Sequence, residues 1–459
     1  MGLYESSLYS VTFQTMKWLL LFCLALAPVL AADYRAGVAT VDITPESSIW
    51  LSGYGSRSKP STGVLQRISA KALAVEDRRG QRVVIVTTDL IGLPRALTDL
   101  VGARVEKEFG LGRANLLLNS SHTHTGPMVR SNLSLIADFD EKQQGVIDEY
   151  ARLLADQLVT IVGSALSGLK PATLAYGEGS AGFAANRREH TADGVKIGVN
   201  PNGLVDHRVP VLRIAGDDGK PIAILFGYAC HNTTLTGETY TISGDYAGFA
   251  QADLEQAYSG STALFLQLCA GDQNPNPRGT EQYAEQHGRT LAAEVRRVLD
   301  GKLIRVRGRL NSVLQWKDLP LQPYARGDFE TMLQSADPMH KRFATAMLKA
   351  LDERRAPRSI PYPVQAVRLG DGFVLVALGG EPVVEYALKI RAANPKLRMI
   401  VAGYSNDVMG YIPTAKMLQE GGYEPVGSTL AYGLPASFAP EVETAVLAEV
   451  NAAVQRVMR

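Results

Sequence analysis

The chain has 459 residues, of which 46% are apolar and 20% are charged, and its formal net charge is +1. This is a globular profile, long enough for one large core or two domains. The even mixture of positive and negative residues excludes the basic face that nucleic acid requires, and it gives no highly charged tail.

The first predicted element is an export signal. Met16 and Lys17 precede an apolar run at residues 18–30, and the small residues Ala31 and Ala32 follow. A basic start, an apolar stretch too short to cross a bilayer and small residues at the cleavage point are typical of a secretory signal. We expect residues 1–32 to be removed, with Met16 as an alternative start, and the protein to be secreted or periplasmic. A short membrane anchor is the alternative.

The remaining residues, 33–459, predict a single α/β domain with a mixed β-sheet core flanked by helices. Apolar, β-branched-rich runs alternate with longer helical patterns, and two hairpins, at 211–224 and 367–376, favour a mixed sheet. The predicted elements in chain order are strands 71–76 and 82–88, helix 95–109, strand 115–119, helix 143–167, strand 221–229, helix 246–258, strand 262–269, helices 280–300 and 327–354, strand 373–378, helix 383–392, strand 398–402 and a helix-like segment 440–457.

Two cysteines, Cys230 and Cys269, follow the signal. An exported protein permits a disulfide, although two cysteines do not make a disulfide scaffold. Two buried thiols and one bridge are equally consistent with the sequence.

Five predicted strands end in polar motifs. In α/β sheets, ligand sites gather at the carboxyl ends of strands, so the five ends are expected to form one pocket. The motifs are Asn119-Ser-Ser-His-Thr-His-Thr-Gly-Pro127, Cys230-His231-Asn232-Thr233-Thr234, Cys269-Ala-Gly-Asp-Gln-Asn-Pro-Asn-Pro277, Gly379-Gly380-Glu381-Pro382 and Gly403-Tyr-Ser-Asn-Asp407.

Three of the seven histidines lie in these motifs. His122 and His124 would point to the same side of an extended chain, and His231 follows a different strand. Neutral imidazoles are good zinc ligands, and one carboxylate, for which Glu381 is a candidate, completes a catalytic zinc site with a position left for water. The alternative is a His-X-His pair that only forms hydrogen bonds within a loop, and the two interpretations are about equal.

Two further segments allow more than one interpretation. The loop at residues 271–276 either holds substrate and orders the surroundings of a metal, or only caps its strand. In Asn186-Arg187-Arg188, Arg187 could bind a carbonyl or anionic group, but such a pair is more often a solvated face.

Six motifs in order, spanning roughly residues 34–430, resemble the neutral, non-lysosomal ceramidases. They are Val38-Ala-Thr-Val-Asp-Ile-Thr-Pro45, Ser121-His-Thr-His-Thr-Gly-Pro127, Gly271-Asp272…Pro275-Asn276, Gly380-Glu381, Ser405-Asn406…Tyr411-Ile-Pro-Thr414 and Tyr423-Glu424. The resemblance implies that family's α/β catalytic domain around a mixed sheet. It also implies a zinc amidase that cleaves the N-acyl bond of ceramide.

Position by position, the resemblance implies one zinc ion per chain, held by His122, His231, Glu381 and Tyr411. Tyr411 is implied by the resemblance alone, since tyrosine is uncommon on zinc. The remaining implied residues are, for catalysis, His124, Arg187, Asn274 and Tyr423, and, for substrate binding, Asp272, Asn276 and Asn406.

The sequence departs from the family pattern in two places. The family's loop normally reads Gly-Asp-X-Ser-Pro-Asn, with a serine regarded as catalytic, whereas this chain has Asn274, which cannot act as a hydroxyl nucleophile. If a zinc-bound water attacks, Asn274 only orients substrate. The chain also ends soon after residues 440–457, so we expect no C-terminal β-sandwich domain of the kind found in longer ceramidases.

We therefore expect an exported zinc-dependent hydrolase that cleaves an amide of a ceramide-like lipid with zinc-activated water. Arg187 or Tyr423 would hold the oxyanion, and His124 would pass a proton to the leaving amine because its unperturbed pKa lies near the working pH. The alternatives are the same machinery acting on another small amide, an ester or a glycoside, and a non-catalytic exported binding protein. A transient contact with a membrane surface stays open, although the charges of the predicted helix 327–354 are mixed.

Overall fold

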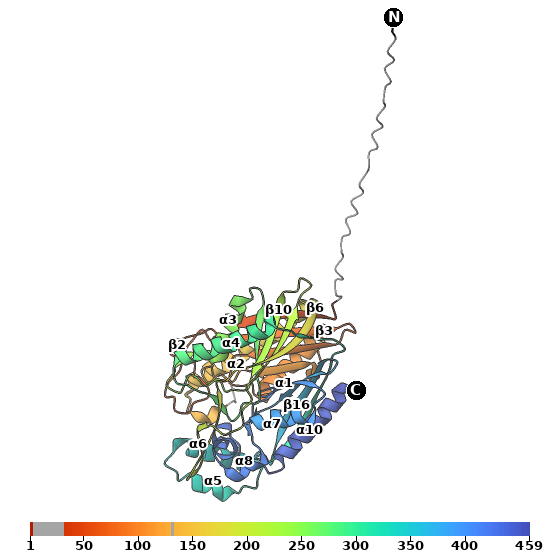
Figure 1. Ribbon diagram of the computed structural model, residues 1–459. Helices are drawn as coiled ribbons and strands as arrows, with labels where there is room; N and C mark the ends of the chain where they lie inside the picture. The colour runs from red at the N-terminus through yellow and green to blue at the C-terminus, as the bar shows by residue number, and fades with distance from the viewer. Residues whose placement is uncertain (3–31, 130–132) are drawn as a thin grey trace. The chain divides into compact units, whose positions relative to one another are not determined.

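Two β-sheets stacked on each other form the centre of the computed structural model (Figure 1). The larger sheet has the strand order β12-β10-β9-β6-β1-β3-β4-β5, with β14 paired to β6. Its β10–β12 and β4–β5 pairs are parallel and its other pairs are antiparallel, so the predicted mixed sheet is confirmed. The strands are β1 (Tyr34–Asp42), β3 (Ser69–Asp77), β4 (Arg82–Thr88), β5 (Leu116–Ser120), β6 (Lys170–Ser180), β9 (Arg208–Ala215), β10 (Pro221–Tyr228), β12 (Thr262–Gln267) and β14 (Ile304–Val306).

The smaller sheet has the order β15-β16-β17-β19, and its inner face packs on the larger sheet. The alternation along β4 shows the layering, because Val83 and Ile85 face the smaller sheet while Val84 and Val86 face helices. Side chains alternate between the two faces of a sheet along each strand. Each inner strand therefore contributes apolar side chains both to the core between the sheets and to the core under the helices. The strands are β15 (Asn311–Pro320), β16 (Ser359–Gly370), β17 (Phe373–Leu378) and β19 (Arg398–Ala402).

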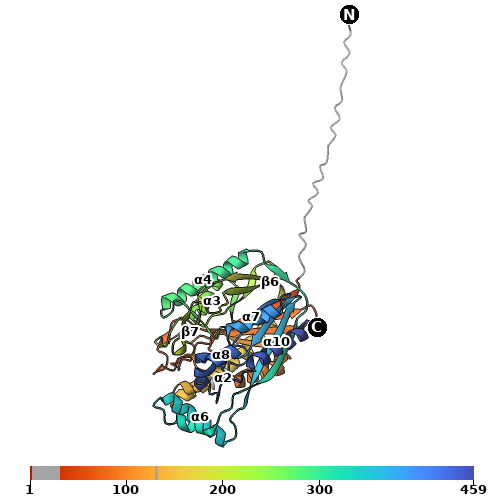
Figure 2. The same ribbon diagram turned by 60° about the horizontal axis from the view of Figure 1, so that its bottom comes forward.

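Helices cover both outer faces, which gives four layers in the order helix, sheet, sheet, helix and confirms the α/β class (Figures 1 and 2). The larger sheet is covered by α1 (Arg95–Phe109), α2 (Glu141–Ser167), α3 (Asp245–Ala257) and α4 (Glu281–Asp300), and the smaller sheet by α7 (Val384–Ala393) and α10 (Val442–Met458).

Short elements border the sheets. They are β2 (Gly63–Val64) with β11 (Thr241–Ile242), the ladder of β13 (Gln273–Pro275), β7 (Ala184–Thr191) and β8 (Gly194–Asn200), β18 (Glu381–Pro382) with β20 (Tyr411–Ile412), and the helical segments η1 (Arg113–Asn115), η2 (Ser134–Ile136), α8 (Ala415–Glu420), η3 (Tyr423–Gly427) and α9 (Thr429–Tyr432).

One predicted helix is wrong in its extent. Residues 327–354 form two helices, α5 (Arg326–Met332) and α6 (Pro338–Asp352), rather than one. Pro338 lacks the N–H that a continuing helix needs, and the Asp337 carboxylate accepts a hydrogen bond from the Met339 N–H, which begins a new helix. In the sequence the pair is inserted between the antiparallel strands β15 and β16, and both views show it at one end of the fold (Figures 1 and 2). We call α5 and α6 the helical cap.

Asn119, the fourth residue of β5, joins the two sheets where their strands end. Its side-chain amide donates hydrogen bonds to the Gln267 and Gly403 carbonyls and to Ser405 Oγ, at 3.3, 2.8 and 3.1 Å, and its carbonyl accepts from the Gln267 N–H at 3.0 Å. Gln267 ends β12 and Gly403 follows β19. One buried side chain thus holds the carboxyl ends of three strands together.

The structure describes residues 1–2, 32–129 and 133–459. The predicted export signal therefore lies almost wholly outside the described residues. Among the residues described, no helix is long and apolar enough to cross a membrane. Cys230 and Cys269 are both buried and free, so these two cysteines are thiols and are not bridged.

The start of α1 depends on a carboxylate from another part of the chain. Pro94 gives no side-chain cap, and Asp407, after β19, accepts a hydrogen bond from the Arg95 N–H at 3.0 Å. Burial, with a smaller contribution from Asp99, raises the pKa of Asp407 from 3.8 to about 7. The folded protein therefore binds a proton at Asp407 more tightly than the unfolded chain does.

This proton affinity predicts that Asp407 lowers stability as the pH rises from about 4 through 7, where the unfolded chain ionises Asp407 first. Asp407→Asn keeps the acceptor for Arg95 and removes the titration. Its free energy of unfolding relative to wild type should rise by on the order of 3 kcal/mol between about pH 4 and about pH 8 in urea denaturation. Glu141→Gln, an exposed acid in the first turn of α2, is the control. A constant difference for Asp407→Asn would contradict the prediction.

Candidate active site

Two histidines at strand ends point their Nε2 atoms at one carboxylate. His122 Nε2 and His231 Nε2 lie 3.0 and 3.1 Å from Glu381 Oε2, and all three residues are buried. The His122 Nδ1 atom lies 2.6 Å from the Ile91 carbonyl, and the His231 Nδ1 atom lies 2.8 Å from the Ala270 carbonyl. In a neutral imidazole whose Nδ1 donates its proton to a carbonyl, the Nε2 atom presents a lone pair.

The backbone fixes these groups from several segments. Glu381 and Tyr411 are register partners in the β18–β20 pair, and the Glu381 N–H donates to the Gly410 carbonyl. The His231 N–H donates to the Gln273 carbonyl. His122 has a φ of 63°, so the expectation of an extended His122-Thr-His124 chain is wrong. The left-handed turn still brings His124 Nε2 to 3.1 Å from His122 Nε2.

The arrangement of donors and acceptors fits a cation. Glu381 Oε2 is buried and makes no hydrogen bond, although two imidazole nitrogens lie beside it. Lone pairs and a carboxylate oxygen that converge without a proton between them are stabilised by a metal ion. Ligand atoms of His122, His124 and His231 also lie within 4.8 Å of one another, so these histidines form a group that could bind a metal.

Burial keeps His124 and His231 neutral. It lowers the pKa of His231 to about 3, with a contribution from the Arg187 charge, and it lowers the pKa of His124 well below its usual value, with contributions from His122 and His231. A neutral imidazole is the form that binds metals and accepts protons. The unperturbed pKa, on which the choice of His124 as proton donor was based, does not apply in the folded protein, because burial lowers it.

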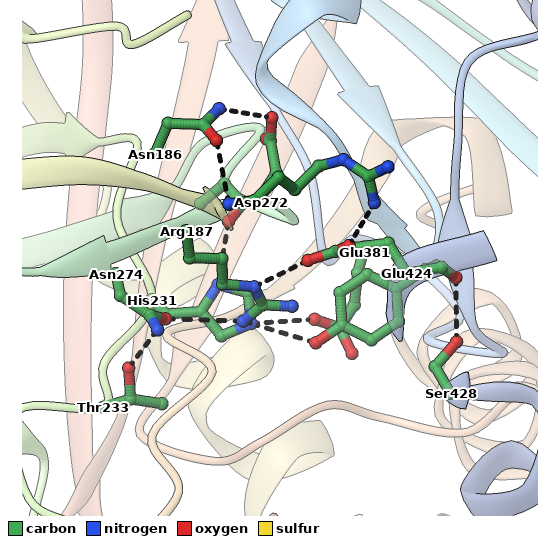
Figure 3. Close-up of polar contacts among 12 residues, drawn as sticks. Asn186, Arg187, His231, Thr233, Asp272, Asn274, Glu381, Glu424 and Ser428 are labelled. Carbon is green, nitrogen blue, oxygen red and sulfur yellow. Dashed lines mark hydrogen bonds and ion pairs between the residues drawn. The ribbon is translucent and has the colours of Figure 1, made fainter. Parts of the chain in front are cut away.

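Arg187 lies beside His231 and is held by Glu424 (Figure 3). Its Nε donates to Glu424 Oε1 at 2.8 Å, and its Nη1 lies 3.2 Å from His231 Nε2 and 3.3 Å from Asn274 Oδ1. Its Nη2 is buried without a partner. Arg188 donates to the other oxygen of Glu424 at 2.6 Å. Both arginines are buried, so the interpretation of this pair as a solvated face is wrong.

Asn274 and Tyr423 contribute further polar groups. Asn274 Oδ1 accepts from Arg187 and from Thr233 Oγ1, both at 3.3 Å, so the amide nitrogen is its remaining donor. Burial, with the charge of Glu381, raises the pKa of Tyr423 to about 12, so its hydroxyl keeps its proton. The Arg187 guanidinium lies 5.6 Å from the centre of the Tyr423 ring.

A cavity of about 230 Å³ lies beside this cluster, and part of the cluster lines it, whereas His231, Arg187 and Asn274 lie behind the lining. Its polar lining comprises His122, His124, Glu381, Tyr411, Tyr423 and Tyr432. The rest of the lining consists of glycines and of the apolar residues Ile91, Leu133, Ile136, Met339, Leu430 and Ala431. Polar groups that converge in a partly apolar cavity are typical of a small-molecule site.

Three residues assigned to substrate binding lie outside this lining. Asp272 accepts hydrogen bonds from the Val384 N–H and from Asn186, at 2.8 and 3.1 Å, and so supports the start of α7. Asn276 is exposed. Asn406 is buried against Arg113, the Leu118 N–H and Gln365. None of the three side chains lines the cavity, and the contacts of Asp272 and Asn406 hold neighbouring segments of the chain in place.

Two residues of the site were not singled out from the sequence. Tyr432 donates a hydrogen bond to Glu381 Oε1 and so orients the carboxylate. Glu424 belongs to the Tyr423-Glu424 motif, from which no role is predicted for it, and it forms ion pairs with Arg187 and Arg188. Glu424 follows Tyr423 directly, which could have drawn attention to it, whereas no pattern near Tyr432 marks that residue.

Comparison with known proteins gives a consistent result. The family model "Neutral/alkaline non-lysosomal ceramidase, N-terminal" matches residues 34–320. The chain is 30% identical to the neutral ceramidase of Pseudomonas aeruginosa over 275 residues, which are 56% of this chain and 40% of that protein. It is 23% identical to the neutral ceramidase of Mycobacterium tuberculosis, with 86% of this chain and 73% of that protein covered.

Solved structures show the same fold. The crystal structure of neutral ceramidase from Pseudomonas aeruginosa aligns with 93% of this chain and 74% of its own, at a TM-score of 0.69 and 22% identity. A structure titled as a ceramidase complexed with C2 aligns at a TM-score of 0.72. The sequence alignments cover less: the chain spans 40% and 36% of the first two curated relatives, the second being neutral ceramidase B of Dictyostelium discoideum.

The convergent acceptors predict about one divalent cation per chain in the purified protein, measured by elemental analysis. The double variant His122→Ala/His231→Ala removes two lone pairs and should lose the metal. His190→Ala, an exposed histidine on β7, is the matched control and should keep it. Metal retained in full by the double variant, or absent from the wild type after supply of zinc, would contradict a metal at this position.

Proposed function

The chain belongs to the neutral/alkaline non-lysosomal ceramidase family, whose model matches more than half of its length, and from this premise we propose that it is a zinc-dependent hydrolase. The bond cleaved is the N-acyl amide of a ceramide-like lipid. The observation that carries the proposal is the convergence of His122, His231 and Glu381 beside a cavity with an apolar wall. A site of this kind combines hydrolytic groups with room for an apolar chain.

One zinc ion would be held by His122, His231, Glu381 and Tyr411. The Tyr411 hydroxyl lies 3.1 Å from His231 Nε2 and so belongs to the same cluster of ligand atoms. The chemistry that bound zinc supplies is acidification of water and polarisation of the scissile carbonyl. Tyr432 orients Glu381, as partners of ligating carboxylates do at other metal sites.

The side chains around the cluster supply binding and proton transfer. Arg187 Nη2, a buried donor without a partner, would hold the negative charge that develops on the carbonyl oxygen, and the Tyr423 hydroxyl would donate beside it. His124 begins neutral, so it would first accept a proton from the attacking water and then deliver it to the leaving nitrogen. Glu424 is a positioning residue, because it would act only through Arg187, whose guanidinium it holds.

Asn274 favours a second candidate function. It has no hydroxyl that could attack or relay a proton, and it would act only as an amide donor to substrate. Its presence supports the same machinery acting on a different small amide, an ester or a glycoside. Substrate selection depends on the groups lining a site rather than on the fold that carries it.

The proposal extends to the rest of the chain. Residues 33–459 would act as one hydrolase unit, exported after removal of residues 1–32, with contact to a membrane surface only during substrate capture. N-terminal sequencing of protein recovered from the medium or the periplasm tests export. An N-terminus that retains the apolar run 18–30 would contradict it.

Turnover on a substrate panel tests the reaction. The zinc-loaded protein should hydrolyse a short-chain ceramide faster than the matching ester or glycoside, with release of a fatty acid and a free amine. Faster turnover of an ester or a glycoside would replace the amide assignment by the second candidate. No turnover of any substrate by protein that contains zinc would favour a binding protein.

Arg187 and Asn274 should respond differently to substitution. Arg187→Ala removes the buried donor and should lower kcat by roughly a hundredfold or more, with zinc content unchanged. Asn274→Ser should keep kcat within about tenfold, because attack does not pass through residue 274. Equal losses in both variants would contradict this division of roles, and loss of zinc from Arg187→Ala would make that residue structural.

A further inference from the structure

Three helical segments supply most of the apolar wall of the cavity, with Ile91 as the remaining apolar residue. Leu133 and Ile136 come from η2 and the residue before it, Met339 from α6, and Leu430 and Ala431 from α9. The three segments contact one another. None of these residues carries a hydrogen-bonding group, so the wall can recognise only shape and apolar surface.

Arg342 ties α6 to η2. Its guanidinium donates to the Leu135 and Ile136 carbonyls at 3.1 and 3.2 Å and pairs with Asp138 at 3.1 Å. Arg342 and Met339 are three residues apart and lie on the same face of α6. The face of α6 that holds η2 therefore also presents Met339 to the cavity.

The helical cap also has a small core of its own. Phe329, Phe343, Ala344 and Met347 are buried together, with Leu135 and Leu430 packed against them. The cap is thus attached to the wall segments η2 and α9 by apolar packing as well as by Arg342. The match to the family model ends at residue 320, before the cap begins.

We propose that Met339 on the helical cap determines the length of apolar chain that the cavity accepts beside the polar cluster. The inference rests on the proposed function for the identity of the substrate, but the geometry concerns the cavity alone. An apolar chain gains free energy with each methylene buried until it meets the wall, and Met339 is a wall residue. Methionine is unbranched and flexible, so its removal lengthens the cavity with little rearrangement.

The test compares the wild type with Met339→Ala and Met339→Phe on a series of N-acyl substrates from acetyl to stearoyl. Met339→Ala should raise kcat/KM for the longest substrates relative to the shortest by roughly threefold to tenfold, and Met339→Phe should lower the same ratio. Zinc content should not change in either variant. A ratio that stays constant in both variants overturns the proposal.

Met347→Ala is the matched control, since it removes the same side chain from the same helix at a site inside the cap and away from the cavity lining. It should lower Tm without changing the chain-length ratio. If Met347→Ala shifts the ratio as far as Met339→Ala does, the effect comes from a loosened cap, and the role of Met339 is overturned.

A binding measurement separates this inference from the proposed function. Saturated fatty acids of increasing length displace an apolar fluorophore from each variant without any turnover. If wild type hydrolyses none of the substrates while Met339→Ala still shifts the chain-length dependence of displacement, the proposed function fails and the inference stands. If hydrolysis proceeds and neither measurement shifts, the inference alone fails.

Discussion

The active site depends on Asn119, because this side chain holds together strand ends that belong to different sheets. Its hydrogen bonds reach Gln267 at the end of β12 and Gly403 after β19, and His122 follows three residues later in its own segment. Stacked sheets twist relative to each other, so the ends of their strands do not meet without a specific connection. A buried amide can make several hydrogen bonds at once, which suits it to this junction.

The chemistry of the site follows from an imbalance of charge in a buried space. Imidazole lone pairs and a carboxylate meet among buried side chains, and a second carboxylate, that of Glu424, is shared by two arginines. Burying charged groups is costly unless each has a partner. Glu424 has its partners within the chain, whereas Glu381 Oε2 does not, and this difference separates a supporting ion pair from a candidate metal position.

Much of the fold could be predicted because each strand carries its own pattern. The bounds of β4, β17 and β19 agree with the predicted residues, and the family resemblance is confirmed. The rule that strand ends share a pocket brought together His122, His231 and Glu381. The same rule does not say in which direction a side chain at a strand end points. Asn406, which follows β19, points away from the cavity and lies against Arg113 and Gln365.

Other features could not be predicted because tertiary contacts create them. The low pKa of His231 arises from burial, and the partnership of Glu424 with two arginines joins segments more than two hundred residues apart. Tyr411 came from the family resemblance alone, since its pairing with Glu381 is a two-residue bridge without a sequence pattern. Asp337-Pro338 marks the break before α6, but the apolar periodicity continues across these two residues and so predicts one helix.

The position of the helical cap has a consequence for how such a protein can change over evolutionary time. Pro320 and Ser359 are paired at the ends of β15 and β16, and the Leu321 N–H donates to the Arg358 carbonyl just beyond them. The cap segment thus begins and ends at neighbouring positions of two paired strands. Such a segment can lengthen or shorten at a small entropic cost, since the entropy of loop closure depends only weakly on loop length. The cap can therefore change in length without moving the strand ends that carry the candidate metal ligands, so the wall of the cavity and the polar cluster can vary independently.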